Sequence, residues 1–276
     1  MGRKEYGRYG KHSRRDRRKK KGGIISTVIL IVAICVFAFS AFQLYKIFNG
    51  YHKGESEYDD LVKLAVTEDK GEQENGTDDQ DGSRFSVDFD ALRQINPDVV
   101  AWIRFDEPAV INYPVVQGSD NSEYLSKTFK GYDNTVGTIF VNAYNHADFN
   151  DRNTIIYGHY MYNGTMFNEL EQYHEKSFWE KYPSFYIYTP DGNVATYQIY
   201  SVGVVKDTSE GYTYQFADDA AFASFLEATK ASSLYDTGVE VGNDSQIVTL
   251  STCTREENDD RTIVHGVRVN VQPAGE

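Results

Sequence analysis

An uninterrupted apolar run near the N-terminus is the longest hydrophobic pattern in the chain. Residues 24–42 read IISTVILIVAICVFAFSAF without a charge, and a helix of about 20 such residues crosses the hydrocarbon core of a bilayer. Eleven Lys and Arg residues stand among the first 21 positions. Because a basic flank stays in the cytoplasm, we predict a basic cytoplasmic tail at 1–23, a single-pass cell-membrane anchor at 24–48, and an extracellular remainder.

A cleaved signal peptide and a nucleic-acid-binding tail are the alternatives for this N-terminal region. The apolar run is longer than the roughly 7–15 residues of a signal-peptide core, and no clean small-x-small cleavage site follows it. A basic run beside a spanning helix indicates topology rather than nucleic-acid binding. We therefore expect an uncleaved anchor.

An acidic, Gly-rich stretch follows at Thr67–Arg84 (TEDKGEQENGTDDQDGSR), while the residues from 49 to 66 can continue the helix. Such a composition has almost nothing to bury, so residues 49–84 are predicted to be an extracytoplasmic tether. The carboxylates of Asp78, Asp79 and Asp81 lack the twelve-residue loop of a calcium site, and no metal is expected there.

From Phe85 onward, short apolar runs alternate with turn residues, which predicts a β-rich domain at 85–276. The predicted strands are Val99–Phe105, Val110–Val116, Thr138–Asn142, Thr154–Tyr157, Phe185–Thr189, Val194–Val205, Gln246–Cys253 and Thr262–Val271.

The connections between these strands point to a barrel. Asp191-Gly192 is a tight-turn signal that joins two strands in a hairpin from Phe185 to about Val205. Helices are predicted at Phe167–His174 and Asp218–Lys230, the second because its apolar residues share one face. Many short strands with few helices predict a mainly β fold, a closed or nearly closed barrel with inserted helices.

The chain contains two cysteines, Cys35 in the apolar run and Cys253 near the C-terminus. The predicted topology puts them in different compartments, so they cannot form a disulfide. An unpaired cysteine outside the cell is a reactive thiol or an intermolecular partner. A buried, inert cysteine in a core strand is the alternative.

The last two predicted strands place Cys253 beside a cation. Ser251 and Cys253 share one strand face, and Cys253 ends the strand. An acidic loop follows, and Arg261 opens the next strand. A thiol at a rigid strand end with a permanent cation nearby suits nucleophilic catalysis with oxyanion stabilisation.

A thiol nucleophile also needs an imidazole, and four histidines lie in the β-rich domain. His159 follows a strand and Gly158, at a strand–loop junction where sites are commonly built. His146 lies in a polar loop, His174 on a helix predicted to be exposed, and His265 in mid-strand as a core or partner residue. Spacing alone favours His159 without deciding among the four.

Several motifs resemble those of one enzyme family. Thr249-Leu250-Ser251-Thr252-Cys253 followed by Arg261 resembles the active-site strands of sortases, whose signature is Thr-Leu-x-Thr-Cys with a downstream Arg. The segment Asn153–His159 is similar to the one that carries the family's catalytic His. The order and spacing of further motifs are similar to those of class B sortases: Trp102-Ile103, Ile111–Gln117, Tyr157–His159, Thr165–Phe167 and the helix at Asp218–Lys230.

This resemblance implies a sortase-like barrel of about eight strands with an N-terminal helix. It implies Cys253 as nucleophile, His159 as general acid/base and Arg261 as the cation that positions substrate and stabilises the oxyanion. Thr252 would shape the oxyanion pocket and Ser251 would lie near the bound peptide. No cofactor and no metal are implied.

The implied activity is a membrane-anchored cysteine transpeptidase. It would cleave an NPxTN-like sorting signal of surface proteins at Thr and join the acyl group to an amine of a lipid II-type peptidoglycan precursor or of a pilin. Nucleic acid is not an expected partner. A pilus-polymerising role, LPxTG-type specificity, a membrane-tethered cysteine hydrolase and a non-catalytic binding barrel remain alternatives. Residues from about Lys206 to Tyr235 are expected to determine specificity.

Overall fold

The computed structural model describes residues 2, 16–69, 84–253 and 259–275. The chain divides into two compact units, residues 1–49 and 50–276. Most of the predicted basic tail, the middle of the predicted tether at 70–83, and the loop residues 254–258 lie outside the described residues.

The first unit consists of the N-terminal part of helix α1 (Asp16–Ala65). Its apolar side chains are exposed along the helix, for example Ile29 and Phe37. Within the described part of the chain, one helix is long and apolar enough to cross a membrane, and it contains this stretch. A helix with apolar residues on all sides needs an apolar surrounding.

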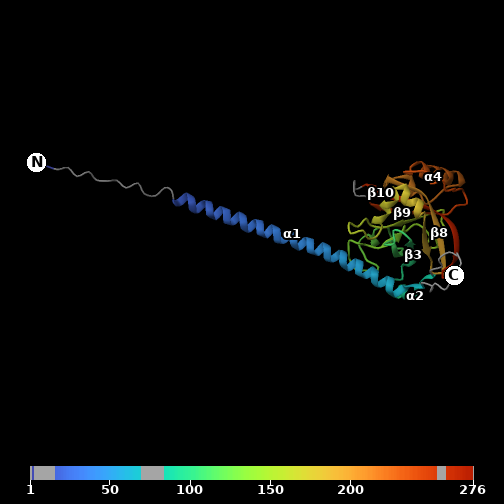
Figure 1. Ribbon diagram of the computed structural model, residues 1–276, viewed down its shortest axis with the longest axis horizontal. Helices are drawn as coiled ribbons and strands as arrows, with labels where there is room; N and C mark the ends of the chain where they lie inside the picture. The colour runs from blue at the N-terminus through green and yellow to red at the C-terminus, as the bar shows by residue number, and fades with distance from the viewer. Residues whose placement is uncertain (1, 3–15, 70–83, 254–258, 276) are drawn as a thin grey trace, which may run out of the picture. The chain divides into compact units, whose positions relative to one another are not determined.

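The second unit is a closed barrel of eight strands in the order β10-β8-β7-β3-β4-β5-β6-β9 (Figure 1). The pairs β4–β5 and β6–β9 are parallel, and the others are antiparallel. The strands are β3 (Val99–Phe105), β4 (Asn112–Val116), β5 (Ile139–Val141), β6 (Asn153–Tyr157), β7 (Ser184–Tyr188), β8 (Asn193–Lys206), β9 (Ile247–Cys253) and β10 (Asp260–Pro273). Each predicted strand is present, and the predicted fold class is confirmed.

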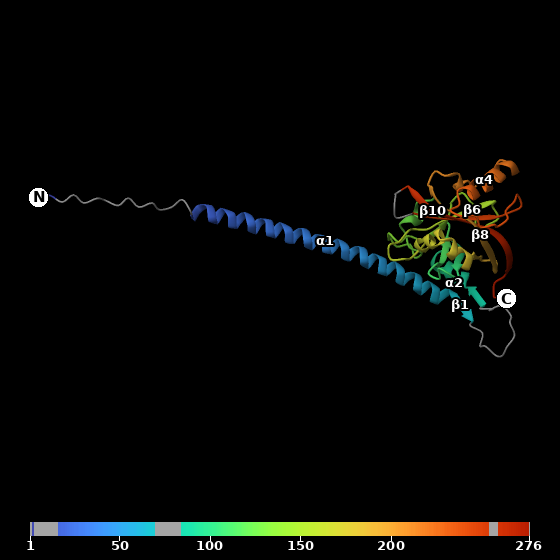
Figure 2. The same cartoon turned by 45° about the horizontal axis from the view of Figure 1, so that its top comes forward.

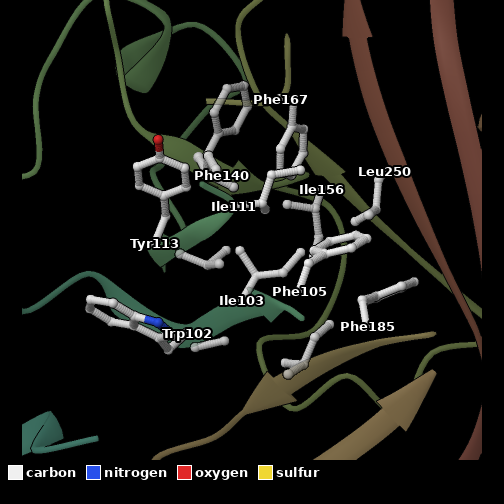
Figure 3. Close-up of a cluster of buried hydrophobic side chains, with 14 of the residues drawn as sticks. Trp102, Ile103, Phe105, Ile111, Tyr113, Phe140, Ile156, Phe167, Phe185 and Leu250 are labelled. Carbon is white, nitrogen blue, oxygen red and sulfur yellow. The ribbon is translucent and has the colours of Figure 1, made fainter. Parts of the chain in front are cut away.

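The barrel interior is filled by apolar side chains that alternate along the strands. Figure 3 shows Ile103 and Phe105 of β3, Ile156 of β6, Phe185 of β7 and Leu250 of β9 in one cluster, all of them buried. Since strand side chains alternate between the faces of a sheet, the neighbouring residues of these strands point outward.

Helix α4 (Asp219–Ala231) covers the outer face of the barrel beside β9 and β10 (Figure 1). The Asp218 carboxylate caps it by accepting a hydrogen bond from Ala221 N at 2.8 Å, and Phe222 packs against Ile247 and Val267. This helix was predicted. The predicted helix at 167–174 is a 3₁₀ helix instead, η2 (Asn168–His174).

The predicted hairpin is also present as β7–β8, with Gly192 at φ +83° in the turn. Elements without a clear sequence signal are all short. They are α2 (Phe89–Ile95), α3 (Lys176–Lys181) and the 3₁₀ turns η1 (Glu123–Leu125) and η3 (Glu210–Tyr212).

The structure differs from the predicted tether at both of its ends. The folded unit begins at Gly50 rather than Phe85, since Leu61 and Ala65 of α1 are buried in the barrel's core cluster. Beyond Ala65, β1 (Val66–Asp69) pairs antiparallel with β2 (Arg84–Val87). Figure 2 shows β1 near α2, where Asp88 N donates a hydrogen bond to Ala65 O at 2.8 Å. The buried residues Leu61, Ala65 and Phe85 hold the two ends of the predicted tether on the barrel.

Candidate active site

A pocket of about 310 Å³ opens where β6, β9 and β10 reach one end of the barrel. Residues from several segments line it: Tyr157 at the end of β6 with Gly158 and His159 after it, Ser251 and Thr252 of β9, Arg261 of β10, Asp207 and Tyr212 after β8, and Asn121, Leu125 and Phe140. The pocket therefore unites four of the five site residues predicted from the sequence, His159, Arg261, Thr252 and Ser251.

His159 is held by the backbone around it. Its Nε2 lies 2.6 Å from the carbonyl oxygen of Leu125. Because a carbonyl only accepts, Nε2 carries the proton, and Nδ1 is left to exchange one. The residue before it must be glycine, since a Cβ on Gly158 would lie 2.6 Å from the Phe167 ring.

The backbone of Cys253 ends β9 directly opposite Arg261 of β10. Arg261 Nη1 donates to the carbonyl oxygen of Asp260 at 2.8 Å, and Nη2 lies 3.5 Å from the Asp207 carboxylate. Lys206 in turn lies 2.6 Å from the Asp260 carboxylate. These contacts hold the guanidinium at the pocket wall, at the strand end where Cys253 lies.

The two residues before Cys253 contribute hydroxyl groups to the pocket. Ser251 Oγ lies 2.7 Å from the hydroxyl of Tyr212. Gly158 N donates to Ser251 O at 3.1 Å, which ties the His159 segment to β9. The buried Thr252 Oγ1 has no hydrogen-bond partner among the residues that the structure describes.

The other three domain histidines lie outside the lining of the pocket. His265 is buried under α4, with its Nδ1 2.9 Å from Thr249 Oγ1, and burial lowers its pKa to about 3. His146 is exposed, and a hydrogen bond to Asp151 raises its pKa. His174 is half-buried and bonds Thr262 Oγ1 at 3.0 Å, so its predicted exposure is wrong. Of the four histidines, His159 is the one that lines this pocket.

Sequence reasoning missed the aromatic wall of the pocket, which Tyr157 and Tyr212 form. The ring of Tyr157 stacks on that of Tyr212, with centroids 6.4 Å apart and planes at 11°. Tyr144 and Tyr214 stack in the same way just beyond, at 6.2 Å and 14°. Tyr212 and Tyr214 belong to the stretch expected to set specificity, but only the fold shows which of its residues face the pocket.

A metal centre has no support in the described part of the chain. No group of three or more His, Cys, Asp or Glu side chains gathers there in a way that would hold an ion. Among the described side chains, those of His159 and Arg261 bring an imidazole and a guanidinium to the pocket.

Comparisons with known proteins agree with the fold and the motifs. The model of the sortase domain matches residues 106–269. Sortase B of Listeria monocytogenes is 33% identical over 169 residues, which cover 60% of this chain and 67% of that protein.

Solved structures give the same result. Sortase B of Bacillus anthracis in complex with AAEK1 superposes with a TM-score of 0.68 at 31% identity, over 81% of this chain and 100% of that one. The sortase B–substrate complex of Staphylococcus aureus has a TM-score of 0.62 at 32% identity, over 66% and 84% of the two chains. With its barrel, its strand-end pocket and these relatives, the chain belongs to the sortase family, as a cysteine transpeptidase of class B.

Proposed function

We propose that Cys253 is the nucleophile, that His159 is the general acid/base, and that Arg261 stabilises the oxyanion. The observation that carries this proposal is the register of the last two strands, which sets Arg261 opposite Cys253 at the mouth of the pocket lined by His159. Thr252 and Ser251 supply further polar contacts to a bound peptide from the same strand.

The reaction follows from these groups. The Cys253 thiolate attacks the carbonyl carbon of the substrate's Thr, and negative charge develops on the carbonyl oxygen beside Arg261. Collapse of this intermediate breaks the C–N bond, and the His159 imidazolium donates its Nδ1 proton to the leaving amine. An acceptor amine, deprotonated by the neutral imidazole, then attacks the thioester, forms the new amide and releases the thiolate.

The substrate that we propose is an NPxTN-like C-terminal sorting signal on a surface protein. Support comes from the class B relatives, one of which was solved as a substrate complex. The acceptor is proposed to be an amine of a lipid II-type peptidoglycan precursor, or alternatively of a pilin subunit. The aromatic wall at Tyr157 and Tyr212 provides apolar surface for a peptide segment next to the reacting carbonyl.

The apolar part of α1 is proposed to be a single-pass anchor with the N-terminus in the cytoplasm and the barrel outside. Its length and hydropathy suit a span, and the basic residues before it suit this orientation. An enzyme tethered to the same membrane as its substrates meets them at raised effective concentration.

A peptide assay tests the proposal. The full chain in detergent is incubated with quenched fluorescent peptides carrying NPxTN-like or LPxTG-like signals, with and without a peptidoglycan-type amine, and products are identified by mass spectrometry. We expect cleavage after Thr of the NPxTN-like peptide and an amide product when the amine is present. Cys253→Ala serves as the blank. Cleavage by Cys253→Ala contradicts the proposed nucleophile. If the peptide ending in a free carboxylic acid is the sole product with the amine present, the hydrolase alternative is supported.

A further inference from the structure

The last turns of α1 pack against the loop between β4 and β5, residues 117–138, within the second unit. Gly54 comes so close to this loop that a Cβ on it would lie 2.9 Å from Val136 Cγ2. Three residues later, the Glu57 carboxylate accepts a hydrogen bond from Lys130 N at 2.8 Å. The helix therefore contacts this loop at both backbone and side-chain level.

Tyr58 makes the most buried of these contacts. Its side chain is 4% exposed, and its hydroxyl donates a hydrogen bond to the carbonyl oxygen of Gly137 at 2.6 Å. The Tyr58 hydroxyl oxygen also lies 3.1 Å from Thr138 Oγ1. Burial raises the pKa of the Tyr58 hydroxyl, so it keeps its proton and remains a donor.

Gly137 is in turn the backbone against which the His159 ring lies. A Cβ on Gly137 would be 2.8 Å from His159 Cδ2 and 3.0 Å from the carbonyl oxygen of Leu125. Its φ of +62° also favours glycine. The imidazole is thus confined between the Gly137 backbone and the Leu125 carbonyl that accepts its Nε2 proton.

We propose that Tyr58 is a positioning residue for the transpeptidation reaction: through Gly137 it holds the His159 ring in the orientation that leaves Nδ1 facing the reacting groups. The inference rests on the role proposed for His159. The last turns of α1 thereby gain a function in the site. Their residues Gly54, Glu57 and Tyr58 fix the loop whose backbone supports the imidazole.

The physical argument depends on how little else orients the ring. Among the described residues, the structure gives the His159 ring one hydrogen bond, to Leu125 O. One bond leaves the ring free to tilt about it. The Gly137 backbone limits this tilt, since it lies so close to the ring that a Cβ on Gly137 would be 2.8 Å from His159 Cδ2. Small misplacements of a catalytic group cost large factors in rate.

Tyr58→Phe in the full chain tests the proposal, because it keeps the ring and removes the donor to Gly137. We expect kcat to fall roughly ten- to a hundredfold with KM for the peptide within twofold of the parent value. In protein labelled with ¹⁵N-histidine, the chemical shifts of Nε2 and Nδ1 of His159 should be well separated in the parent chain. In Tyr58→Phe these two shifts should move toward each other as the ring samples other orientations. Tyr51→Phe is the matched control on the same helix and should change neither quantity.

A second variant keeps the test decisive if Tyr58→Phe does not fold. Gly54→Ala retains Tyr58 and adds a helix-favouring residue, but its methyl group displaces the helix from Val136. It should lower kcat in the same direction and leave KM unchanged.

Unchanged kcat and unchanged ¹⁵N shifts in a folded Tyr58→Phe or Gly54→Ala protein overturn the inference. His159→Gln separates this failure from that of the proposed function. If His159→Gln is inactive while the Tyr58 variant is normal, only the positioning role is lost. If His159→Gln is active, the function proposed for His159 fails first.

Discussion

Two histidine environments in this barrel use the same side chain in opposite ways. His265 lies in the middle of β10 under α4, is 1% exposed, and makes a hydrogen bond to Thr249 in the adjacent strand. His159 lies two residues past the end of β6, half-buried at a pocket, with a backbone carbonyl as its partner.

The difference shows what position along a strand does to a polar group. In mid-strand, neighbouring strands and a covering helix remove water, and the cost of charging the His265 imidazole keeps it neutral. Past the strand end, the imidazole keeps access to solvent and to a ligand, and within the part of the chain that the structure describes one of its nitrogens is hydrogen-bonded. The first environment makes histidine a core residue, and the second makes it available for proton transfer.

Two single variants, His159→Gln and His265→Gln, should differ most in kcat/KM for peptide cleavage. His159→Gln is expected to lower kcat/KM by about 10²- to 10⁴-fold, because glutamine cannot exchange a proton. Its free energy of unfolding should change by less than about 0.5 kcal/mol, since the side chain is only half-buried. His265→Gln is the control and should keep its kcat/KM in peptide cleavage. An active His159→Gln enzyme would contradict the comparison.

The pocket end of β10 is tested next by Arg261→Lys. Lysine keeps the charge but loses the planar fork, so we expect a fall of about 10²- to 10³-fold in kcat. Arg268→Lys, farther along the same strand, should leave peptide cleavage unchanged. If Arg261→Lys retains more than half of the parent kcat, oxyanion stabilisation by the guanidinium is not needed.

The buried environment predicts a pH effect on stability. Burial lowers the pKa of His265 from 6.5 to about 3, so between these values the unfolded chain binds a proton that the folded one excludes. Stability is therefore lost as pH falls below 6.5, by about 2 kcal/mol at pH 5 from this residue. Urea unfolding in detergent at pH 7 and pH 5 should show a smaller loss for His265→Gln than for the parent chain. Equal losses in the two proteins would mean that His265 is not the group responsible.

The smallest expected effect concerns the aromatic wall of the pocket. Tyr212→Phe removes the hydroxyl 2.7 Å from Ser251 Oγ but keeps the ring that stacks on Tyr157. One net hydrogen bond is worth about 0.5–1.5 kcal/mol, so KM for the peptide should rise roughly two- to tenfold with kcat unchanged. The exposed Tyr132 provides the control Tyr132→Phe. A lower kcat instead of a higher KM would indicate that Tyr212 touches the reacting groups.

The part of the site that could be predicted is the part governed by local pattern. Alternation placed Cys253 at a strand end, and the polar loop before Arg261 implied that the two strands are neighbours, as their register shows. The choice of His159 needed the resemblance, because its place after a strand and Gly158 favours it over His146 and His174 but does not show which histidine reaches the pocket.

The remaining parts depend on contacts between distant segments. Asn121 and Asp207 reach the pocket because the barrel brings the ends of their loops together, and no periodicity encodes this. The β1–β2 pair joins two short segments whose composition resembles a solvated linker. Its formation depends on two buried residues, Ala65 just before β1 and Phe85 within β2, rather than on the strand residues as a whole.

The parallel pairing of β6 with β9 has a consequence for biogenesis. This pair joins Asn153–Tyr157 to Ile247–Cys253, and β10, which closes the barrel between β9 and β8, comes last in the chain. Contacts between segments so far apart in sequence form slowly, since a long loop must close before they stabilise the fold. During synthesis the chain therefore carries His159 long before it carries Cys253 or Arg261. A chain that ends before Ile247 lacks the last two strands and with them the pocket residues Ser251, Thr252 and Arg261, so the proposed site forms only when synthesis is almost complete.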